Sequence, residues 1–578
     1  MDNLTIARVF ADVADLLEIK GENPFKIRAY RNGSDTIAHW PDPLATMDEA
    51  ALRAIPGVGK DLAGKIRELV ETGRSAYHQE LLQEFPPTIL ELMTLQGVGP
   101  RTVARLHASL GIRTLADLEQ AAKDGRIRAL KGMGPKKEAL ILEALDERRR
   151  HAGRHLLSDT AETAAALVAW LQTECPATEF IPVGSLRRGC ETCGDLDILA
   201  VGGTPAVIDR FVTYGLVERV LGQGDTKGSV LLGSGIQADL RLVPVESRGA
   251  AMQYFTGSKP HNISVRDRAA GRGLKLNEYG LFDVATGERV AGDSEAGIYE
   301  RLGLAWVPPE LREYRGELEA AESHRLPRLI AREDVLGDLH MHTTETDGRD
   351  DLEAMVESAR AAGLRYLAIT DHSRSLAMAN GLDERRVIAQ AARIRALNDR
   401  LEDFTVLAGI ECDIRPDGSM DLADDCLAEL DIVVASVHSA FNQDEAQMTD
   451  RVLSAIEHPY VDVIGHPTGR LLLKREPYRL QMDRAIAAAA AHGVALEINS
   501  QPDRLDLGDT HARLARERGV KLVVSSDAHT RAGLVALRWG VVVARRAWAT
   551  PDDVLNTRPV EGFRAGLRRN RTRPRSEA

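Results

Sequence analysis

The middle of the chain is organised by residues 184–199, GSLRRGCETCGDLDIL. The apolar run that starts at Leu196 predicts a β-strand, and because strand side chains alternate, Asp195 and Asp197 are expected on one face of it. A second short alternating segment, QADLRLV at residues 237–243, carries Asp239 and is predicted to be a neighbouring strand. Carboxylate oxygens suit Mg2+, which keeps room for substrate phosphates, and two such ions can clamp an in-line displacement.

The order of the motifs resembles the palm of family X DNA polymerases. Gly-Ser at 184–185 and the Asp-x-Asp pair are followed by Asp239 and by YFTGS at residues 254–258. The resemblance implies that Asp195 and Asp197 bind both Mg2+ ions and that Asp239, the better proton-acceptor candidate, binds the metal at the primer 3'-hydroxyl. It assigns the incoming triphosphate to Gly184, Ser185, Arg188 and Gly194. A loop ending in acidic surface residues is the alternative, which the full set of motifs disfavours.

The segment YFTGSKPHNISVR at residues 254–266 extends this resemblance. Tyr254 and Phe255 offer flat faces to sugar and base, and Gly257 lets the backbone approach the sugar closely. Asn262 and Arg266 match residues that reach the minor-groove edges of the nascent pair, where acceptors lie at nearly constant positions. The alternative is a strand, turn and helix with two aromatic core residues.

Composition bounds the protein class. A chain of 578 residues with 44% hydrophobic content predicts about three to five domains with ordinary cores. The net charge of −12 does not exclude nucleic acid, since local Lys and Arg decide phosphate contacts. Five cysteines give no disulfide framework, and the Cys190/Cys193 spacing is interpreted as accidental. Without a signal-peptide pattern or a run of 18 apolar residues, we expect a soluble, cytoplasmic protein with no membrane contact.

The first 150 residues contain a threefold recurrence. IPGVGKDLAGKI starts at residue 55, LQGVGPRTVARL at 95 and LKGMGPKKEALI at 130. Each copy resembles the helix-hairpin-helix motif, in which glycines let turn N–H groups approach a DNA phosphate beside a helix N-terminus. We therefore expect DNA contacts at Gly57, Gly59, Gly97 and Gly99. A plain helix–helix turn is the alternative, above all for the third copy.

An N-terminal segment, NPFKIRAYRNGSDTI at residues 23–37, looks like the small lyase domain attached to several family X members. The resemblance places Lys65 at the position of a lysine that forms a Schiff base with 5'-deoxyribose phosphate, with Lys26 and Tyr30 on the DNA-binding side. Such a lysine works only if its pKa is lowered. A solvated lysine that touches backbone phosphate is the alternative.

From residue 336, histidines and carboxylates recur where predicted strands end: DLHMHTTETDG, LAITDHS, LAGIECDI, VVASVHSA, DVIGHPTGR, ALEINS and VVSSDAH. Functional residues of (β/α) barrels gather at these ends. This half is similar to the polymerase and histidinol phosphatase (PHP) family, whose fold is a distorted seven-stranded barrel. The resemblance implies one metal at His340, His342, Glu411 and Asp527, a second at Glu411, His438 and His466, and a third at Asp347, His372 and His529.

Mixed imidazole and carboxylate ligands suit up to three Mn2+ or Zn2+ ions, which activate water against phosphorus. The PHP resemblance implies 3'-5' exonuclease action, with 3'-phosphatase or abasic-site cleavage as further options. A scaffolding barrel without activity is the alternative.

The predicted fold class is multidomain, α+β and α/β: a helical helix-hairpin-helix region, a nucleotidyltransferase palm and a C-terminal distorted (β/α)7 barrel. The expected segments are 1–80 (lyase-like), 81–155 (helix-hairpin-helix), 156–320 (palm and nucleotide selection), 321–335 (linker), 336–560 (PHP) and 561–578 (basic tail). The expected function is gap-filling DNA synthesis with 3' end processing in base excision repair, by a monomer acting on gapped or primer–template DNA and dNTPs. A template-independent nucleotidyltransferase and a DNA-binding scaffold with inactive sites are the alternatives.

Overall fold

A computed structural model describes residues 3–38, 40, 44–55, 57–95, 98–151 and 153–568. It divides into two compact units, residues 1–152 and 153–578. Two predictions lie outside the described residues, namely the DNA contact at Gly97 and the basic tail from residue 569 onward. The prediction of a multidomain chain with helical, α+β and α/β parts is confirmed.

The first unit is helical. Its α-helices are α1 (Asn3–Lys20), α2 (Pro24–Ala38), α3 (Glu49–Ala54), α4 (Lys60–Thr72), α5 (Ala76–Glu84), α6 (Thr88–Glu91), α7 (Pro100–Leu110), α8 (Leu115–Lys123) and α9 (Gly134–His151). Short 3-10 turns occupy Leu44–Thr46 and Leu92–Thr94. Buried side chains from Ile6 to Leu145 form one apolar core. Each repeated Gly-x-Gly segment leads into a helix, since Gly59 and Gly99 are the N-caps of α4 and α7.

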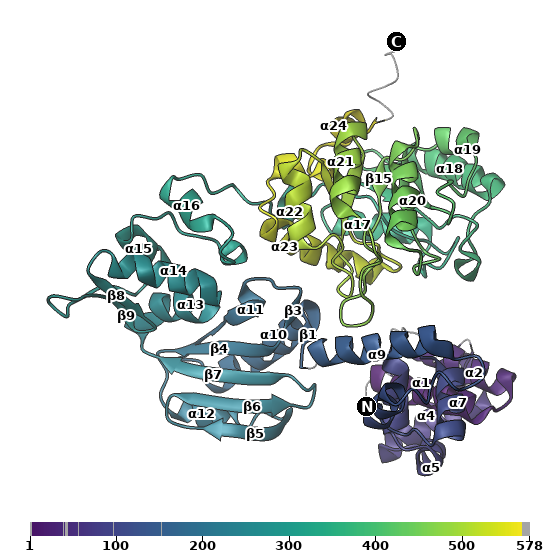
Figure 1. The fold of residues 1–578 in the computed structure, drawn as a ribbon, viewed down its shortest axis with the longest axis horizontal. Coiled ribbons are helices and arrows are strands. Elements are labelled where there is room, and N and C mark those ends of the chain that lie inside the picture. Colours follow the sequence, from purple (N-terminus) through teal and green to yellow (C-terminus); the bar gives the residue numbers. More distant parts are fainter. Residues whose placement is uncertain are drawn as a thin grey trace, which may run out of the picture. The chain divides into compact units, whose positions relative to one another are not determined.

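The second unit begins with a five-stranded sheet in the order β2-β4-β7-β6-β5 (Figure 1). Its strands are β2 (Glu179–Pro182), β4 (Asp195–Val201), β5 (Val217–Gln223), β6 (Lys227–Leu232) and β7 (Gln237–Val243), and a two-stranded sheet pairs β1 (His155–Leu156) with β3 (Thr192–Cys193). The helices here are α10 (Leu157–Glu174), α11 (Gly184–Arg187) and α12 (Ala206–Phe211). Strands β4 and β7 run parallel, as the predicted neighbours.

Alternation along β4 sorts its side chains between two cores. Leu196 and Ile198 pack with α10 and α12, whereas Leu199 and Val201 pack with Ala251 on the opposite face. Asp195 and Asp197 share the parity of Leu199, so both carboxylates start from the face on which α13 packs.

Two helices and a small sheet follow. The elements are the turn Val245–Ser247, α13 (Arg248–Thr256), α14 (Lys259–Ala270), β8 (Leu274–Asn277), β9 (Gly280–Asp283), β10 (Arg289–Ala291), α15 (Glu295–Arg301), the turn Pro309–Leu311 and α16 (Glu317–Glu322). The YFTGS segment joins α13 to α14. It therefore belongs to a helix–turn–helix, and the alternative of a strand before the turn is wrong. Gly257 has a positive φ of 71° at this turn.

The C-terminal part is a barrel-like sheet of seven parallel strands in sequence order. Its strands are β11 (Gly337–Asp338), β12 (Tyr366–Ile369), β13 (Thr405–Asp413), β14 (Ile432–Ser436), β15 (Val463–Ile464), β16 (Ala495–Asn499) and β17 (Leu522–Ser525). A parallel bridge between Met341 and Ala528 connects the first strand region with the last. The predicted (β/α)7 barrel is confirmed.

Helices surround these strands (Figure 1). They are α17 (Leu352–Ala361), α18 (Glu384–Asn398), α19 (Asp424–Ala428), α20 (Glu445–Glu457), α21 (Met482–His492), α22 (Asp509–Glu517), α23 (Leu537–Arg546) and α24 (Val560–Gly566), with 3-10 turns at Arg332–Asp334, Ala377–Ala379, Arg531–Ala536, Pro551–Asp553 and Leu555–Thr557. Phe563 of α24 is buried and packs with Tyr366 of β12. The predicted basic tail, 561–578, thus starts within a packed helix.

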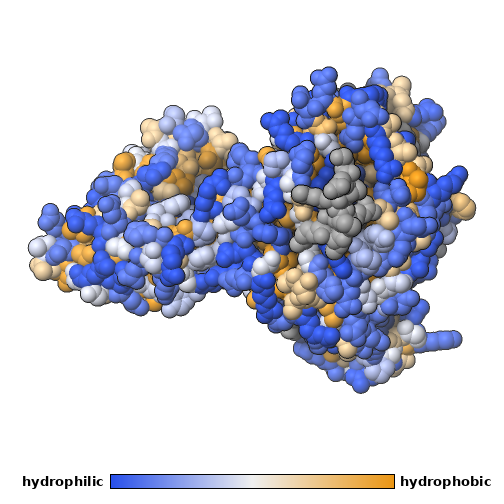
Figure 2. Space-filling model, turned by 90° about the horizontal axis from the view of Figure 1, so that it is seen from above, coloured by the Kyte–Doolittle hydropathy of each residue, from blue (hydrophilic) through white to orange (hydrophobic). Residues whose placement is uncertain are grey.

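Elements beside the five-stranded sheet, namely α10, α11 and β3, share apolar packing with the barrel. Leu157 and Cys193 belong to the largest apolar cluster, which is built mainly from barrel residues, and Leu186 and Val542 pack against it. On the face seen in Figure 2, hydrophilic residues predominate and apolar ones are interspersed. Among the helices of the described ranges, none combines the length and apolar character needed to span a membrane.

Two candidate metal centres

The three predicted palm carboxylates come together on adjacent strands. Asp197 and Asp239 are direct Cα partners in the parallel β4–β7 pair, and Asp195 stands opposite Gln237. A pocket at this point is lined by Asp197, Asp239, Val183, Ile198, Leu199, Lys227, Arg241 and Phe255. Backbone pairing thus places Asp197 and Asp239 side by side, with Asp195 two residues before Asp197 on the same strand, and the roles of all three as metal ligands stay a prediction.

The pKa values of Asp197 and Asp239 are shifted in opposite directions. Burial, followed by the negative charges of Asp195 and Asp239, raises the pKa of Asp197 to about 6. Burial also acts to raise the pKa of Asp239, but hydrogen bonds from Lys227 and Ser229 outweigh it and lower that pKa. Lys227 Nζ lies 2.8 Å from Asp239 Oδ2. Carboxylate oxygens from neighbouring strands at a small pocket are the ligands that Mg2+ prefers, so the residues present fit this ion.

The predicted triphosphate loop, residues 184–190, packs tightly beside Asp197. Gly184 has a positive φ of 65°, and a Cβ there would meet Asp197 Oδ2 at 2.7 Å, so only glycine lets the loop approach. The Arg188 guanidinium is engaged by other protein groups. Its Nε lies 3.0 Å from Glu313 Oε1, and its Nη1 donates to the Thr256 carbonyl. Gly194 and Ser185 flank the same turn, and their phosphate contacts remain predictions.

The YFTGS region is held by its own contacts. The rings of Tyr254 and Phe255 meet edge to face at 5.0 Å, and the Arg241 guanidinium lies 4.9 Å from the Phe255 ring centre. Asn262 donates to the Tyr254 carbonyl at 2.7 Å and accepts from Gln253. Arg266 is exposed one helical turn further along α14. The minor-groove roles of Asn262 and Arg266 stay predictions.

The barrel residues gather around Glu411. One carboxylate oxygen, Oε2, lies 2.8 Å from His372 Nδ1 and 3.3 Å from His340 Nε2. The other, Oε1, lies 2.9 Å from His466 Nε2 and 3.2 Å from His438 Nε2. Such a position suits a carboxylate that bridges two ions, as the resemblance implied.

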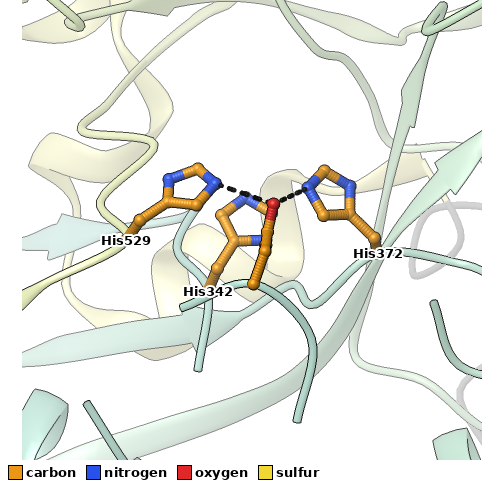
Figure 3. Close-up of side chains that lie close together, drawn as sticks. His342, His372 and His529 are labelled. Carbon is orange, nitrogen blue, oxygen red and sulfur yellow. Dashed lines mark ion pairs between the residues drawn. The ribbon is translucent and has the colours of Figure 1, made fainter. Parts of the chain in front are cut away.

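The outer edge of the centre is formed by His342, His372 and His529, whose rings converge (Figure 3). Asp347 Oδ2 lies 3.4 Å from His372 Nε2 and 3.5 Å from His529 Nε2. His342 also lies 3.1 Å from Asp527 through Nε2, so it borders two ligand groups. Three groups could each hold an ion: His342, Asp347, His372 and His529; His340, His342 and Asp527; and His372, Glu411 and His438. His342 and His372 each belong to two of these groups, and the division of the nine residues among three ions stays a prediction.

Comparisons with known proteins place the chain in a family. Family models match residues 1–75 (Helix-hairpin-helix domain), 89–147 (SAM-like Helix-hairpin-helix tandem), 251–313 (DNA polymerase beta thumb) and 338–501 (PHP domain). The DNA polymerase/3'-5' exonuclease PolX of Bacillus subtilis (strain 168) is 38% identical over 573 residues, which cover 99% of this chain and 100% of that protein. This chain belongs to the family X DNA polymerases that carry a PHP domain.

Two further relatives match parts of this family X polymerase. DNA polymerase lambda of Rattus norvegicus is 25% identical over 342 residues, 54% of this chain and 56% of that protein. A probable phosphatase of Thermoanaerobacter sp. (strain X514) is 30% identical over 233 residues, 38% of this chain and 89% of that protein. The motif-based resemblance to the two families is confirmed.

Unpartnered atoms in the PHP centre of this family X polymerase fit metal ligation. Within the described residues, five buried atoms of this centre have no hydrogen-bond partner. They are Glu411 Oε2 and the ring nitrogens His340 Nε2, His342 Nδ1, His372 Nδ1 and His466 Nδ1. Burial and the neighbouring rings of His529 and His372 lower the pKa of His342 to about 3, which keeps the ring in its neutral, metal-binding form. Buried nitrogen and oxygen atoms that lack a hydrogen-bond partner are free to bind divalent ions.

Sequence reasoning missed the residues that orient these ligands. Glu497 Oε1 lies 2.8 Å from His340 Nδ1, while its Oε2 accepts from the backbone N–H of His466. Asp413 lies 2.9 Å from His438 Nδ1, and Asn499 donates to Asp527 Oδ2 at 2.9 Å. Such partners fix the ring orientation of ligating histidines. Their signal was present, because Glu411 with Asp413 and Glu497 with Asn499 are i, i+2 pairs at strand ends.

The candidate lyase residues of the helical unit also assemble. Lys65 pairs with Asp61, and its ammonium lies 5.5 Å and 5.2 Å from the ring centres of Tyr30 and Tyr77. Lys26 donates to the Tyr77 hydroxyl at 2.6 Å. Burial acts to lower the pKa of Lys65, but hydrogen bonds to Asp61 and Tyr30 raise it overall. This pKa opposes a Schiff-base role in the absence of substrate.

Proposed function

We propose that this family X polymerase extends DNA primers at Asp195, Asp197 and Asp239 and trims 3' ends at its PHP centre. The observation that carries the synthetic half is the direct pairing of Asp197 with Asp239 across parallel strands at a pocket. The hydrolytic half is supported by the convergence of histidines on Glu411. The name of the Bacillus subtilis relative, a DNA polymerase/3'-5' exonuclease, supports both the synthetic and the hydrolytic activity.

In the palm, Asp195 and Asp197 would hold two Mg2+ ions and Asp239 one of them. When bound, these ions supply charge neutralisation for the triphosphate and the 3'-hydroxyl. The chain itself supplies position: β4 and β7 fix the carboxylates, the 184–190 loop cradles phosphate, and Phe255 and Tyr254 face sugar and base. Asp239 accepts the proton of the primer hydroxyl. Catalysis then depends mainly on positioning.

In the barrel, His340, His342, Asp347, His372, Glu411, His438, His466, Asp527 and His529 would hold Mn2+ or Zn2+. These ions supply activation of water and polarisation of the phosphodiester. Glu497 and Asp413 hold the ligand rings of His340 and His438 in orientation. The expected product is a shortened 3' end.

The helical unit supplies DNA contacts. Its match to two helix-hairpin-helix models implies DNA binding, and we assign phosphate contacts to the turns at Gly57, Gly59 and Gly99 before α4 and α7. Contacts of this kind position a duplex without reading sequence. Gap filling in base excision repair, action as a monomer and a cytoplasmic location complete the proposal.

A one-nucleotide gapped duplex with a 5'-phosphate tests these activities together. The purified protein should extend the primer by the templated nucleotide with Mg2+ and shorten 3' ends with Mn2+. Incorporation on a primer without template would favour the rival template-independent transferase. Absence of both reactions would favour the DNA-binding scaffold.

Lyase action at Lys65 is a second candidate function, favoured by its place between Tyr30, Tyr77 and Asp61. Borohydride trapping on a 5'-deoxyribose phosphate end tests it. Lys65→Ala should abolish the trapped product. Trapping of equal yield in that variant would contradict the assignment.

A further inference from the structure

Arg546, at the end of α23 in the PHP domain, reaches the palm. Its side chain is only 7% exposed. Nη1 donates to the carbonyl of Arg188 at 2.8 Å and lies 3.1 Å from Glu313 Oε1, while Nη2 lies 2.9 Å from Asp509 Oδ2. A PHP side chain therefore satisfies a main-chain oxygen of the predicted triphosphate loop.

Glu313 connects the two arginines. Its Oε1 atom accepts from both Arg546 Nη1 and Arg188 Nε, the latter at 3.0 Å. Arg188 in turn donates to the carbonyl of Thr256, in the YFTGS segment. A continuous chain of charge-assisted hydrogen bonds thus runs from α23 through the triphosphate loop to the turn at Thr256. Such bonds are stronger than bonds between neutral groups.

Backbone packing fixes the same contact. A Cβ on Gly189, next to Arg188, would lie 2.2 Å from Val542 Cγ1 of α23. The loop and the PHP helix therefore touch without room for a side chain between them. Because the loop presses on α23 and is bonded to Arg546, it has little freedom to adopt another conformation.

We propose that Arg546 is a positioning residue for nucleotidyl transfer, which holds the 184–190 loop in its phosphate-binding conformation from the PHP side. This inference rests on the proposed assignment of that loop to the triphosphate. Without Arg546, the Arg188 carbonyl loses its donor, and Glu313 keeps only one guanidinium. Nucleotide affinity therefore depends on the PHP domain, although that domain contributes no palm metal ligand.

Steady-state incorporation of one nucleotide by the full chain tests the inference, on a gapped duplex whose primer has a 3'-terminal phosphorothioate linkage. Arg546→Gln should raise KM for the dNTP about tenfold, equivalent to about 1.4 kcal/mol, with kcat changed less than about twofold. Arg546→Lys should recover part of the loss. Arg545→Gln is the matched control, since Arg545 precedes Arg546 in the same helix but binds Glu310 and the Ile330 carbonyl, and it should behave as wild type.

Glu313→Gln provides a second route should Arg546→Gln fail to fold, and it should raise KM in the same direction. Exonuclease rate and melting temperature report folding. Unchanged KM in both folded variants would overturn the inference, as would a fall in kcat alone. Ser185→Ala separates the two claims: if it too leaves KM unchanged, the proposed assignment of the loop to the triphosphate fails, whereas a raised KM there limits the failure to Arg546.

Discussion

Asp197 of β4 and Asp239 of β7 face each other directly across two parallel strands. Lys227 Nζ lies 2.8 Å from Asp239 Oδ2 and compensates the charge of that carboxylate. Burial and the neighbouring carboxylates, by contrast, raise the pKa of Asp197 to about 6. A negative charge on the buried Asp197 carboxylate costs folding free energy. We interpret this cost as one that is kept for function.

Asp197→Asn should therefore stabilise the metal-free protein at pH 8. The raised folded pKa means that the folded state binds more protons than the unfolded state between pH 3.8 and about 6, so wild-type stability falls as pH rises through that window. The gain should be about 1–3 kcal/mol at pH 8 and vanish below about pH 4. Denaturant unfolding with chelator at pH 4, 6 and 8 measures it.

Asp225→Asn, at an exposed position, is the control and should show no such gain. Added Mg2+ should stabilise wild type but not Asp197→Asn. A variant no more stable than wild type at pH 8 would contradict this explanation of the raised pKa.

Glu497→Gln should weaken the PHP centre while sparing the palm. Because Glu497 contacts both the His340 ring and the His466 backbone, its loss should reduce metal affinity or exonuclease rate about 10- to 100-fold. Bound metal measured by mass spectrometry, together with 3' trimming, checks this. Glu429→Gln, whose side chain is 63% exposed, should leave both unchanged, and a Glu497→Gln variant that keeps both its metal affinity and its exonuclease rate would refute the role.

Glu295→Gln should destabilise the segment after the palm in a pH-dependent way. Burial acts against the charge of Glu295, but Arg187 and Arg312 outweigh it and lower its pKa to about 2. The stabilisation is therefore fully present above about pH 4.5 and disappears as pH falls toward 2. Breaking this buried pair should cost about 3–5 kcal/mol at pH 7.

A calorimetric pH series measures that loss. Glu322→Gln removes a more exposed pair with Arg268 at 2.7 Å and should cost much less than Glu295→Gln, because solvent screens exposed ion pairs. Equal costs for the two variants, or a Glu295→Gln cost that stays constant down to pH 2, would be inconsistent with the depressed pKa.

Asp61→Asn should speed lyase trapping if Lys65 is the nucleophile. The Asp61 carboxylate helps to raise the pKa of Lys65, so its removal leaves more neutral amine at pH 7, and the neutral amine is the reactive form. Borohydride trapping over time should rise a few-fold. Lys20→Ala, which removes a surface pair with Glu84, should have no effect, and slower trapping in Asp61→Asn would argue for another nucleophile.

Local patterns predicted much of this molecule and left its long-range contacts open. Alternation was enough to place Asp195, Asp197 and Asp239 on strands β4 and β7, since each carboxylate sits next to apolar residues of opposite parity. The sharing of His342 and His372 between ligand groups depends on barrel register, which no local pattern encodes. The engagement of Arg188 by Glu313 depends on packing between segments 125 residues apart, so its free, phosphate-facing position was the simpler expectation.

Extension and trimming scored on one gapped duplex, for Asp197→Asn and for the double variant His340→Ala/His342→Ala, separate the two centres. Two independent sites predict that Asp197→Asn stops extension but still shortens 3' ends, while the histidine variant extends normally and no longer trims. If either folded variant lost both reactions, or kept the one assigned to its altered site, two separate metal centres could not account for the chemistry.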